Sequence, residues 1–184
     1  MSKNLKINVF CSIAILLIVS YFFGIGLQNN AKEIEKAVLS LNQPMTKIVH
    51  IEALENNKAI AFYEWGTAPE DYFGIINLKK DLFGWHLMNG STSATPKEYK
   101  IGWSFSDLKR DFSNYTDILY GKIFDAEIVD VLVNTDNGKQ YSAKIIDDNN
   151  GEKFWFLITD GVKLTGSTIT ARSQDGKIIE QITR

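Results

Sequence analysis

The sequence has almost no cysteine. Its only thiol is Cys11, which lies near the start of an apolar segment. The rest of the chain cannot form a disulfide, supply a thiol nucleophile or hold zinc through thiolates. A domain built from it must be held together by its hydrophobic core alone.

Histidine is nearly as scarce, since His50 and His86 are the only two. One imidazole binds a metal weakly, and nothing in the spacing forces these two together, so we expect no metal site and no cofactor. The G-x-S-x-G elbow, the phosphate loop and the dinucleotide fingerprint are also missing from the sequence. We therefore name no catalytic residue and favour a protein that is not an enzyme.

An excess of positive charge is missing too. Residues 28–184 carry 18 basic and 22 acidic residues, because Lys3 and Lys6 precede them, which leaves a net charge of −4. An acidic domain has no electrostatic reason to bind the phosphate backbone of a nucleic acid. We expect no nucleic-acid partner.

Charge of either sign is missing from residues 7–27, "INVFCSIAILLIVSYFFGIGL". As a helix these 21 residues span about 31 Å, close to the thickness of the hydrocarbon core of a bilayer. Lys3 and Lys6 lie before the segment, so the positive-inside rule keeps the N-terminus in the cytoplasm. The sequence predicts a single-pass protein of the cell membrane whose C-terminal domain is extracellular.

A cleavable signal peptide is the alternative for this segment. Such peptides have an apolar region of about 7 to 15 residues and a cleavage site between small residues. The segment here is longer, and "GIG" at residues 24–26 is a poor version of that site. We therefore favour a permanent anchor over cleavage.

Beyond the apolar segment, one helix and many strands are expected. Ile34, Ala37, Val38 and Leu41 recur at helical spacing and predict a short amphipathic helix that ends before Pro44. Alternating apolar residues between turns rich in Gly, Asn and Asp then predict antiparallel strands. The expected strands are Lys47–Ala53, Ala59–Trp65, Tyr72–Leu78, Phe83–Met88, Tyr99–Phe105, Ile118–Phe124, Glu127–Val133, Gln140–Ile146, Lys153–Ile158, Ser167–Ala171 and Lys177–Ile182.

The fold class predicted is mainly β: a transmembrane helix, a short amphipathic helix and an antiparallel β-sheet domain. The character of the strands changes near residues 107–120, from aromatic-rich to short with tight turns. This change indicates either one continuous sheet system or two small lobes, the second resembling a sandwich. The corresponding division is residues 1–6 cytoplasmic, 7–27 anchor, 28–112 a helix with a β-meander lobe, and 113–184 a β-rich lobe.

The stretch "LKKDLFGWHLMNG", residues 78–90, places Trp85 beside His86. In a strand that starts at Phe83, Phe83, Trp85 and Leu87 share one face, whereas His86 points to the other. Trp85 and His86 therefore do not form one site, and we expect a packed hairpin whose reversal is "KKD".

The segment "DDNNGE" at residues 147–152 lacks the alternating ligands of a calcium loop, and we expect a hairpin turn there.

Aromatic residues near an acidic loop are the best candidates for a binding surface, because aromatic side chains dominate interface energetics. The candidates are Tyr63, Glu64, Trp65, Tyr72 and Trp103. A core position remains the alternative for each aromatic side chain among them. Glu64, Glu70 and Asp71 could also pair as the carboxylates of a hydrolase, although we favour a solvent-facing loop with acids at its ends.

The segments "NKAIAFYEW" and "YFGIINLKKDLFGWHLMNG", followed by "YGKIFDAEIVDVLV" and "FWFLITDG", resemble a loose group of small, N-terminally anchored exported proteins from Bacillus-type Gram-positive bacteria. The resemblance implies a cell-surface location and a β-rich fold, but no activity. We expect a non-catalytic role in binding, sensing or assembly at the cell envelope, with an envelope protein as partner. The alternatives are an envelope hydrolase acting on wall glycan or peptide through carboxylates, and an inhibitor or accessory subunit of a membrane enzyme.

Overall fold

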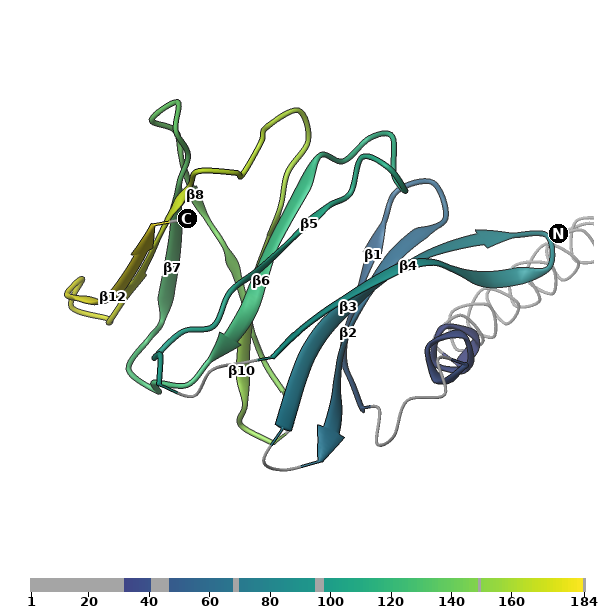
Figure 1. The fold of residues 1–184 in the computed structure, drawn as a ribbon, viewed down its shortest axis with the longest axis horizontal. Helices are drawn as coiled ribbons and strands as arrows, with labels where there is room; N and C mark the ends of the chain where they lie inside the picture. Colours follow the sequence, from purple (N-terminus) through teal and green to yellow (C-terminus); the bar gives the residue numbers. More distant parts are fainter. Residues whose placement is uncertain (1–31, 41–46, 68–69, 95–97, 149, 184) are drawn as a thin grey trace, which may run out of the picture.

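The computed structural model describes residues 32–40, 47–67, 70–94, 98–148 and 150–183 (Figure 1). The side chains of Thr67, Glu70 and Asp71 are also outside the description, as are the cytoplasmic segment and the membrane anchor predicted at residues 1–27. The described chain is mainly β with antiparallel sheets and one short helix, as the sequence predicts. No helix in these ranges is long and apolar enough to cross a bilayer.

The strands form three sheets of four strands each. The first sheet is a meander in the order β1-β2-β3-β4, made of β1 (Lys47–Leu54), β2 (Lys58–Thr67), β3 (Glu70–Asp81) and β4 (Gly84–Ala94). The second has the order β5-β6-β10-β9, made of β5 (Ser104–Asp107), β6 (Asp117–Ile123), β9 (Lys144–Asp147) and β10 (Lys153–Ile158). The third has the order β12-β11-β7-β8, made of β7 (Asp130–Asn134), β8 (Gln140–Ser142), β11 (Thr168–Arg172) and β12 (Ile178–Thr183).

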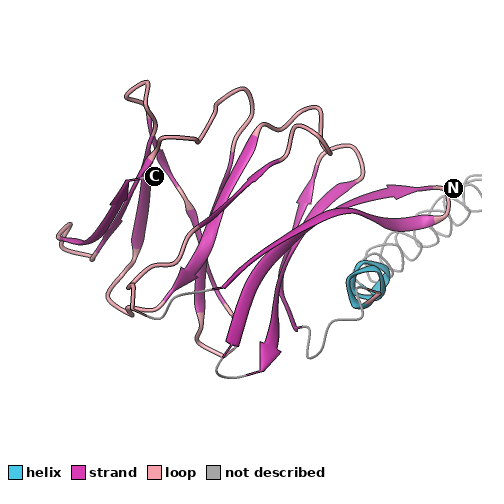
Figure 2. Ribbon diagram, in the orientation of Figure 1, coloured by secondary structure: helices cyan, strands magenta, loops and turns pink. Residues whose placement is uncertain are grey.

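The second sheet lies between the other two and is buried on both faces (Figure 2). On β6, Ile118 and Tyr120 pack in the core shared with the first sheet, whereas Leu119 packs in the core shared with the third. On β10, Phe154 and Trp155 divide between the same two cores. Successive side chains of a strand point to opposite faces, which explains why these strands are nearly continuous apolar runs.

The short helix, residues 32–39, covers the outer face of the first sheet (Figure 2). Ile34 and Val38 are buried, and they pack in one cluster with Ala59, Ala61 and Leu78. The two apolar helix residues are four positions apart and so lie on one face of the helix, as the predicted periodicity requires.

The expected strand Gln140–Ile146 is wrong in one respect, because the chain breaks it at Ala143. β8 pairs with β7 in the third sheet, whereas β9 pairs with β10 in the second. The Ala143 N–H donates to the carbonyl of Val131 at 2.8 Å, which holds the crossing point against the third sheet. An alternating pattern continues through such a crossing, so the sequence does not reveal it.

The expected reversal at "KKD" is also wrong, because β3 continues to Asp81 and the turn consists of Leu82 and Phe83. The Asp81 carboxylate accepts the Phe83 N–H at 2.7 Å, and Gly84 adopts a φ of 112°. Phe83 consequently lies outside the strand and is 90% exposed, not packed beside Trp85. Trp85 itself packs against the cluster under the helix.

Candidate functional site

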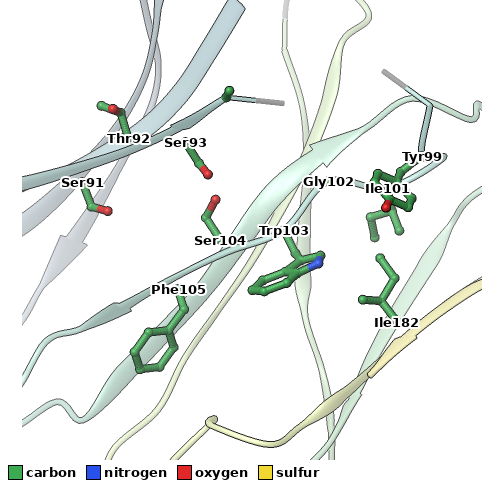
Figure 3. A pocket seen from close by; sticks show the side chains of 11 residues that line it. Ser91, Thr92, Ser93, Tyr99, Ile101, Gly102, Trp103, Ser104, Phe105 and Ile182 are labelled. Atoms are coloured by element: carbon green, nitrogen blue, oxygen red, sulfur yellow. The ribbon is translucent and has the colours of Figure 1, made fainter. Parts of the chain in front are cut away.

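A groove of about 520 Å³ opens between β4 and β5, the terminal strands of the first and second sheets (Figure 3). One wall is the end of β4 and the other is β5 with the residues before it. Ile182 of β12 closes one end, so all three sheets contribute. The lining residues are Ser91, Thr92, Ser93, Ala94, Tyr99, Ile101, Gly102, Trp103, Ser104, Phe105 and Ile182.

The wall that leads into β5 is held in place by a close backbone approach. The Gly102 N–H donates to the Lys122 carbonyl at 2.8 Å, and the Gly102 carbonyl accepts the indole N–H of the buried Trp155 at 3.0 Å. A Cβ on Gly121 would overlap that same carbonyl, so only glycine fits there. Lys122 of β6 and Trp155 of β10 thus hold the backbone of Gly102 in place through hydrogen bonds.

The third sheet fastens the same wall through one carboxylate. Glu180 of β12 accepts the backbone N–H groups of Lys100 and Ile101 at 2.7 and 2.9 Å. A carboxylate that accepts two N–H groups makes charge-assisted bonds, which are stronger than those between neutral groups. The groove wall is therefore tied to both the second and the third sheet.

The β4 wall is positioned by Tyr120, whose ring is fully buried in the core between the first two sheets. Its hydroxyl donates to the Ser91 carbonyl at 3.3 Å across the two sheets. Burial raises the pKa of the Tyr120 hydroxyl, so it remains a neutral donor at physiological pH. The side chains of Ser93 and Ser104 point toward one another across the groove (Figure 3).

The chemistry of the groove is neutral and amphipathic. Hydroxyl groups come from Ser91, Thr92, Ser93 and Ser104, and each can donate or accept a hydrogen bond. Trp103 and Tyr99 are 36% and 48% exposed and supply apolar surface. No charged side chain occurs among the described residues that line the groove, so these residues supply no carboxylate, ammonium or imidazole to act as a general acid or base.

The predicted binding residues lie in several places. Trp103 is the only one of the five that lines the groove in the described part of the chain. Trp65 and Tyr72 are opposite each other on β2 and β3 and stack with ring centroids 4.4 Å apart. Tyr63 is 2% exposed in the cluster under the helix, and burial raises the pKa of its hydroxyl to about 12.

Glu64 belongs to an ion-pair cluster that also contains Lys47, Lys122, Asp148 and Glu152. Its carboxylate pairs with Lys122 and lies 3.7 Å from the Lys47 ammonium. Lys47 also pairs with Asp148 at 2.7 Å, and both lysines lie 3.4 Å from Glu152. Burial alone would lower the pKa of Lys122, but its acidic partners outweigh burial and raise it. The geometry of Glu64 supports a structural link between the first two sheets rather than the proton transfer of a hydrolase.

The two histidines lie on opposite edge strands of the first sheet. His50 of β1 contacts Glu52 at 2.8 Å, and His86 of β4 contacts Asp81 at 2.8 Å. In the described ranges no three His, Cys, Asp or Glu side chains gather in a way that could hold a metal ion.

No protein-family model matches the chain, and no curated protein matches it. The fold and the groove define a layered antiparallel β domain with an open groove whose described lining residues are uncharged. The resemblance to exported Gram-positive proteins stays a prediction.

The β4 and β12 residues of the groove were not predicted from the sequence. The available signal was "STSAT" at residues 91–95, a run of small hydroxyl residues at the end of a strand. That signal is weak, because such runs are equally typical of loops.

Proposed function

We propose that this protein is a membrane-anchored, extracytoplasmic β domain that binds a segment of an envelope protein without catalysing a reaction. The observation that carries the proposal is the 520 Å³ groove between β4 and β5, which combines an exposed Trp103 with the hydroxyl side chains of three serines and a threonine and has no charged side chain among its described lining residues. Binding pockets are typically apolar clefts of about 300 to 1,000 Å³ with a few polar groups that fix orientation.

An extended peptide is the occupant that suits this groove best. Its two walls are strand segments, and the four residues Ser91–Ala94 would span about 13 Å as a strand. A peptide laid along them can hydrogen-bond its amides to the serine hydroxyls and place an apolar side chain on Trp103. Trp and Tyr are the side chains most enriched among residues that dominate binding energy. The neutral lining favours an uncharged segment.

The proposed location rests on the sequence. Residues 7–27 are free of charge and long enough to cross a bilayer, and Lys3 and Lys6 precede them. The test is labelling of intact cells with a membrane-impermeant maleimide in a Cys11→Ser, Lys163→Cys variant, since Lys163 is exposed. Labelling of whole cells supports an extracellular domain, and labelling only after lysis contradicts it.

Site-specific crosslinking in cells tests the groove. Ala94 is exposed and lines the groove, so a photoreactive benzoylphenylalanine in its place reaches an occupant with little effect on the core. The matched control carries the same group at Lys139, which is exposed in the turn between β7 and β8. We expect one protein adduct from position 94 and none from position 139.

Trp103→Ala, introduced into the chain that carries benzoylphenylalanine at position 94, tests how much Trp103 contributes to binding. We expect the adduct to fall about tenfold or more, because truncating a dominant aromatic contact costs about 2 kcal/mol or more. The thermal midpoint should change by only a few degrees, since Trp103 is a third exposed. Equal adduct yields with and without Trp103→Ala would contradict a peptide-binding groove. Adducts with wall glycan only would contradict it as well.

A further inference from the structure

We infer that the tip of the β3–β4 hairpin, Leu82 and Phe83, inserts into the outer surface of the lipid bilayer. These two side chains are 99% and 90% exposed, far more than the other large apolar side chains of the described residues. The inference rests on the proposed membrane anchoring and is independent of the groove.

Apolar residues at this tip are not required by the turn itself. Asp81 and Gly84 set its geometry, because the Asp81 carboxylate accepts the Phe83 N–H at 2.7 Å and Gly84 adopts a φ of 112°. Asp81 also contacts His86 at 2.8 Å, which braces the base of the turn. Two-residue hairpin turns usually carry Asn, Asp or Gly at the central positions, where they stay hydrated. Leu82 and Phe83 instead present two large apolar groups to the surroundings.

The fold brings this tip beside the helix at residues 32–39, which follows the predicted anchor in the sequence. The hairpin reaches past the helix at residues 32–39, on the side of the molecule opposite the third sheet (Figure 1). The Lys80 ammonium lies 3.5 Å from the Glu33 carboxylate, and a Cβ on Gly84 would lie 3.9 Å from the same carboxylate. The helix is docked on the first sheet through Ile34 and Val38, so hairpin and helix keep a fixed relation.

The distance along the chain then favours lipid as the occupant. Only five residues separate residue 27, the last of the apolar segment, from Glu33. Six residue steps span at most about 20 Å, so the helix that touches the hairpin must lie close to the bilayer surface. A second copy of the protein or a soluble partner has no comparable constraint that holds it at this tip.

The residues behind the tip suit the membrane interface. Lys79 is exposed, and the Lys80 ammonium lies 6.0 Å from the centre of the Trp85 ring. Lysine and tryptophan are typical of the interface, where the charged end stays among head groups. Because Asp81 and Glu33 offset the two lysines, apolar insertion rather than attraction to anionic lipid should drive the contact.

Depth-dependent quenching of a fluorophore tests the inference in the full-length chain. Phe83→Cys in a Cys11→Ser background is labelled with the polarity-sensitive dye NBD and reconstituted in vesicles of phosphatidylcholine. We expect blue-shifted emission and strong quenching by lipids that carry a doxyl group near the head group. Lys139→Cys, in the exposed turn between β7 and β8, is the matched control and should give water-like emission without quenching. Adding anionic phosphatidylglycerol should change the position-83 signal little.

A second variant separates insertion from simple proximity. Leu82→Asp, introduced into the chain that carries NBD at position 83, should abolish the blue shift and the quenching, because a charge opposes entry into the membrane interface. The fold should tolerate it, since Leu82 is 99% exposed. Blue-shifted emission without quenching would place the tip against protein, and water-like emission would leave it in solvent; either result overturns the inference. Flotation of the same chain with the vesicles reports the anchor separately, so a chain that floats without quenching refutes the hairpin contact alone.

Discussion

Gly121 illustrates how a single residue sets the shape of the groove. It lies on β6 directly beneath Gly102, whose carbonyl also receives the indole N–H of Trp155 at 3.0 Å. A side chain at position 121 would push the Gly102 backbone outward and break this bond, which leaves a buried N–H without its acceptor. The groove wall thus depends on two glycines and a tryptophan, of which only Gly102 touches the groove.

We predict that Gly121→Ala lowers the free energy of unfolding by about 3 kcal/mol, the upper range for overpacking a buried site. Urea unfolding monitored by tryptophan fluorescence measures the change. Gly90→Ala is the matched control, because a Cβ there would lie 3.5 Å from the Ile75 carbonyl, an ordinary contact, in a strand of the same domain. The proposal for Gly121 fails if both variants have the same midpoint.

The ion-pair cluster joins strands β1, β2 and β6 to the turn between β9 and β10. Lys47 and Glu64 come from the first sheet, whereas Lys122, Asp148 and Glu152 come from the second. Asp148 also accepts the N–H groups of Asn150 and Glu152 at 2.8 and 2.9 Å, so the turn and the cluster share one carboxylate. The hairpin turn predicted at residues 147–152 therefore also fastens two sheets together.

The cluster predicts a specific dependence of stability on pH. The bond to Lys47 lowers the pKa of Asp148 below its ordinary value of 3.8, so the stabilisation is present above pH 3.8 and is lost as pH falls through the lowered pKa. Asp148→Asn should cost about 1 kcal/mol near neutral pH, a value typical of partly exposed pairs, and almost nothing at pH of about 2. Urea midpoints of both proteins across this range provide the measurement. A difference that is constant with pH would show that the side chain acts only through the turn.

At the scale of the whole molecule, the second sheet is the common element of two cores. Ile118 and Leu119 are adjacent on β6, yet one packs against the first sheet and the other against the third. Neither outer sheet can complete its core without the middle one. From this arrangement we predict that the three sheets unfold as a single cooperative unit.

Calorimetry of Ile118→Ala and Leu119→Ala tests that cooperativity. Each truncation should lower stability by about 2 to 5 kcal/mol through cavity formation. Each should shift one common unfolding transition, because loss of either core destabilises the shared sheet. Two separate transitions, each sensitive to only one of the variants, would instead indicate two independently folding lobes.

Local patterns in the sequence were sufficient to predict the β-rich class, the short helix and most strand positions. Side-chain alternation on β1 and β2 and turns such as "TDNGK" arise from interactions between residues close in the chain, so they leave a readable period. The sequence also named Trp103 among the candidate binding residues, because aromatic side chains dominate interface energetics, but only the structure showed that Trp103 lines the groove. The sequence pattern placed the reversal between β3 and β4 at residues 79–81 instead of at Leu82 and Phe83, since Phe83 looks like a strand residue.

Only the tertiary structure decided which strands share a sheet, and therefore where the groove lies. Ser93, Ser104 and Ile182 line one groove because parts of three sheets meet there, and such arrangements depend on long-range packing that has no period in the sequence. The break at Ala143, where the chain passes from the third sheet to the second, has the same origin. By itself the sequence determined the elements and the acidic, disulfide-free character of the chain beyond residue 27, because these follow from composition and local geometry. The sheets, their shared cores and the groove required the energy of contacts between distant segments.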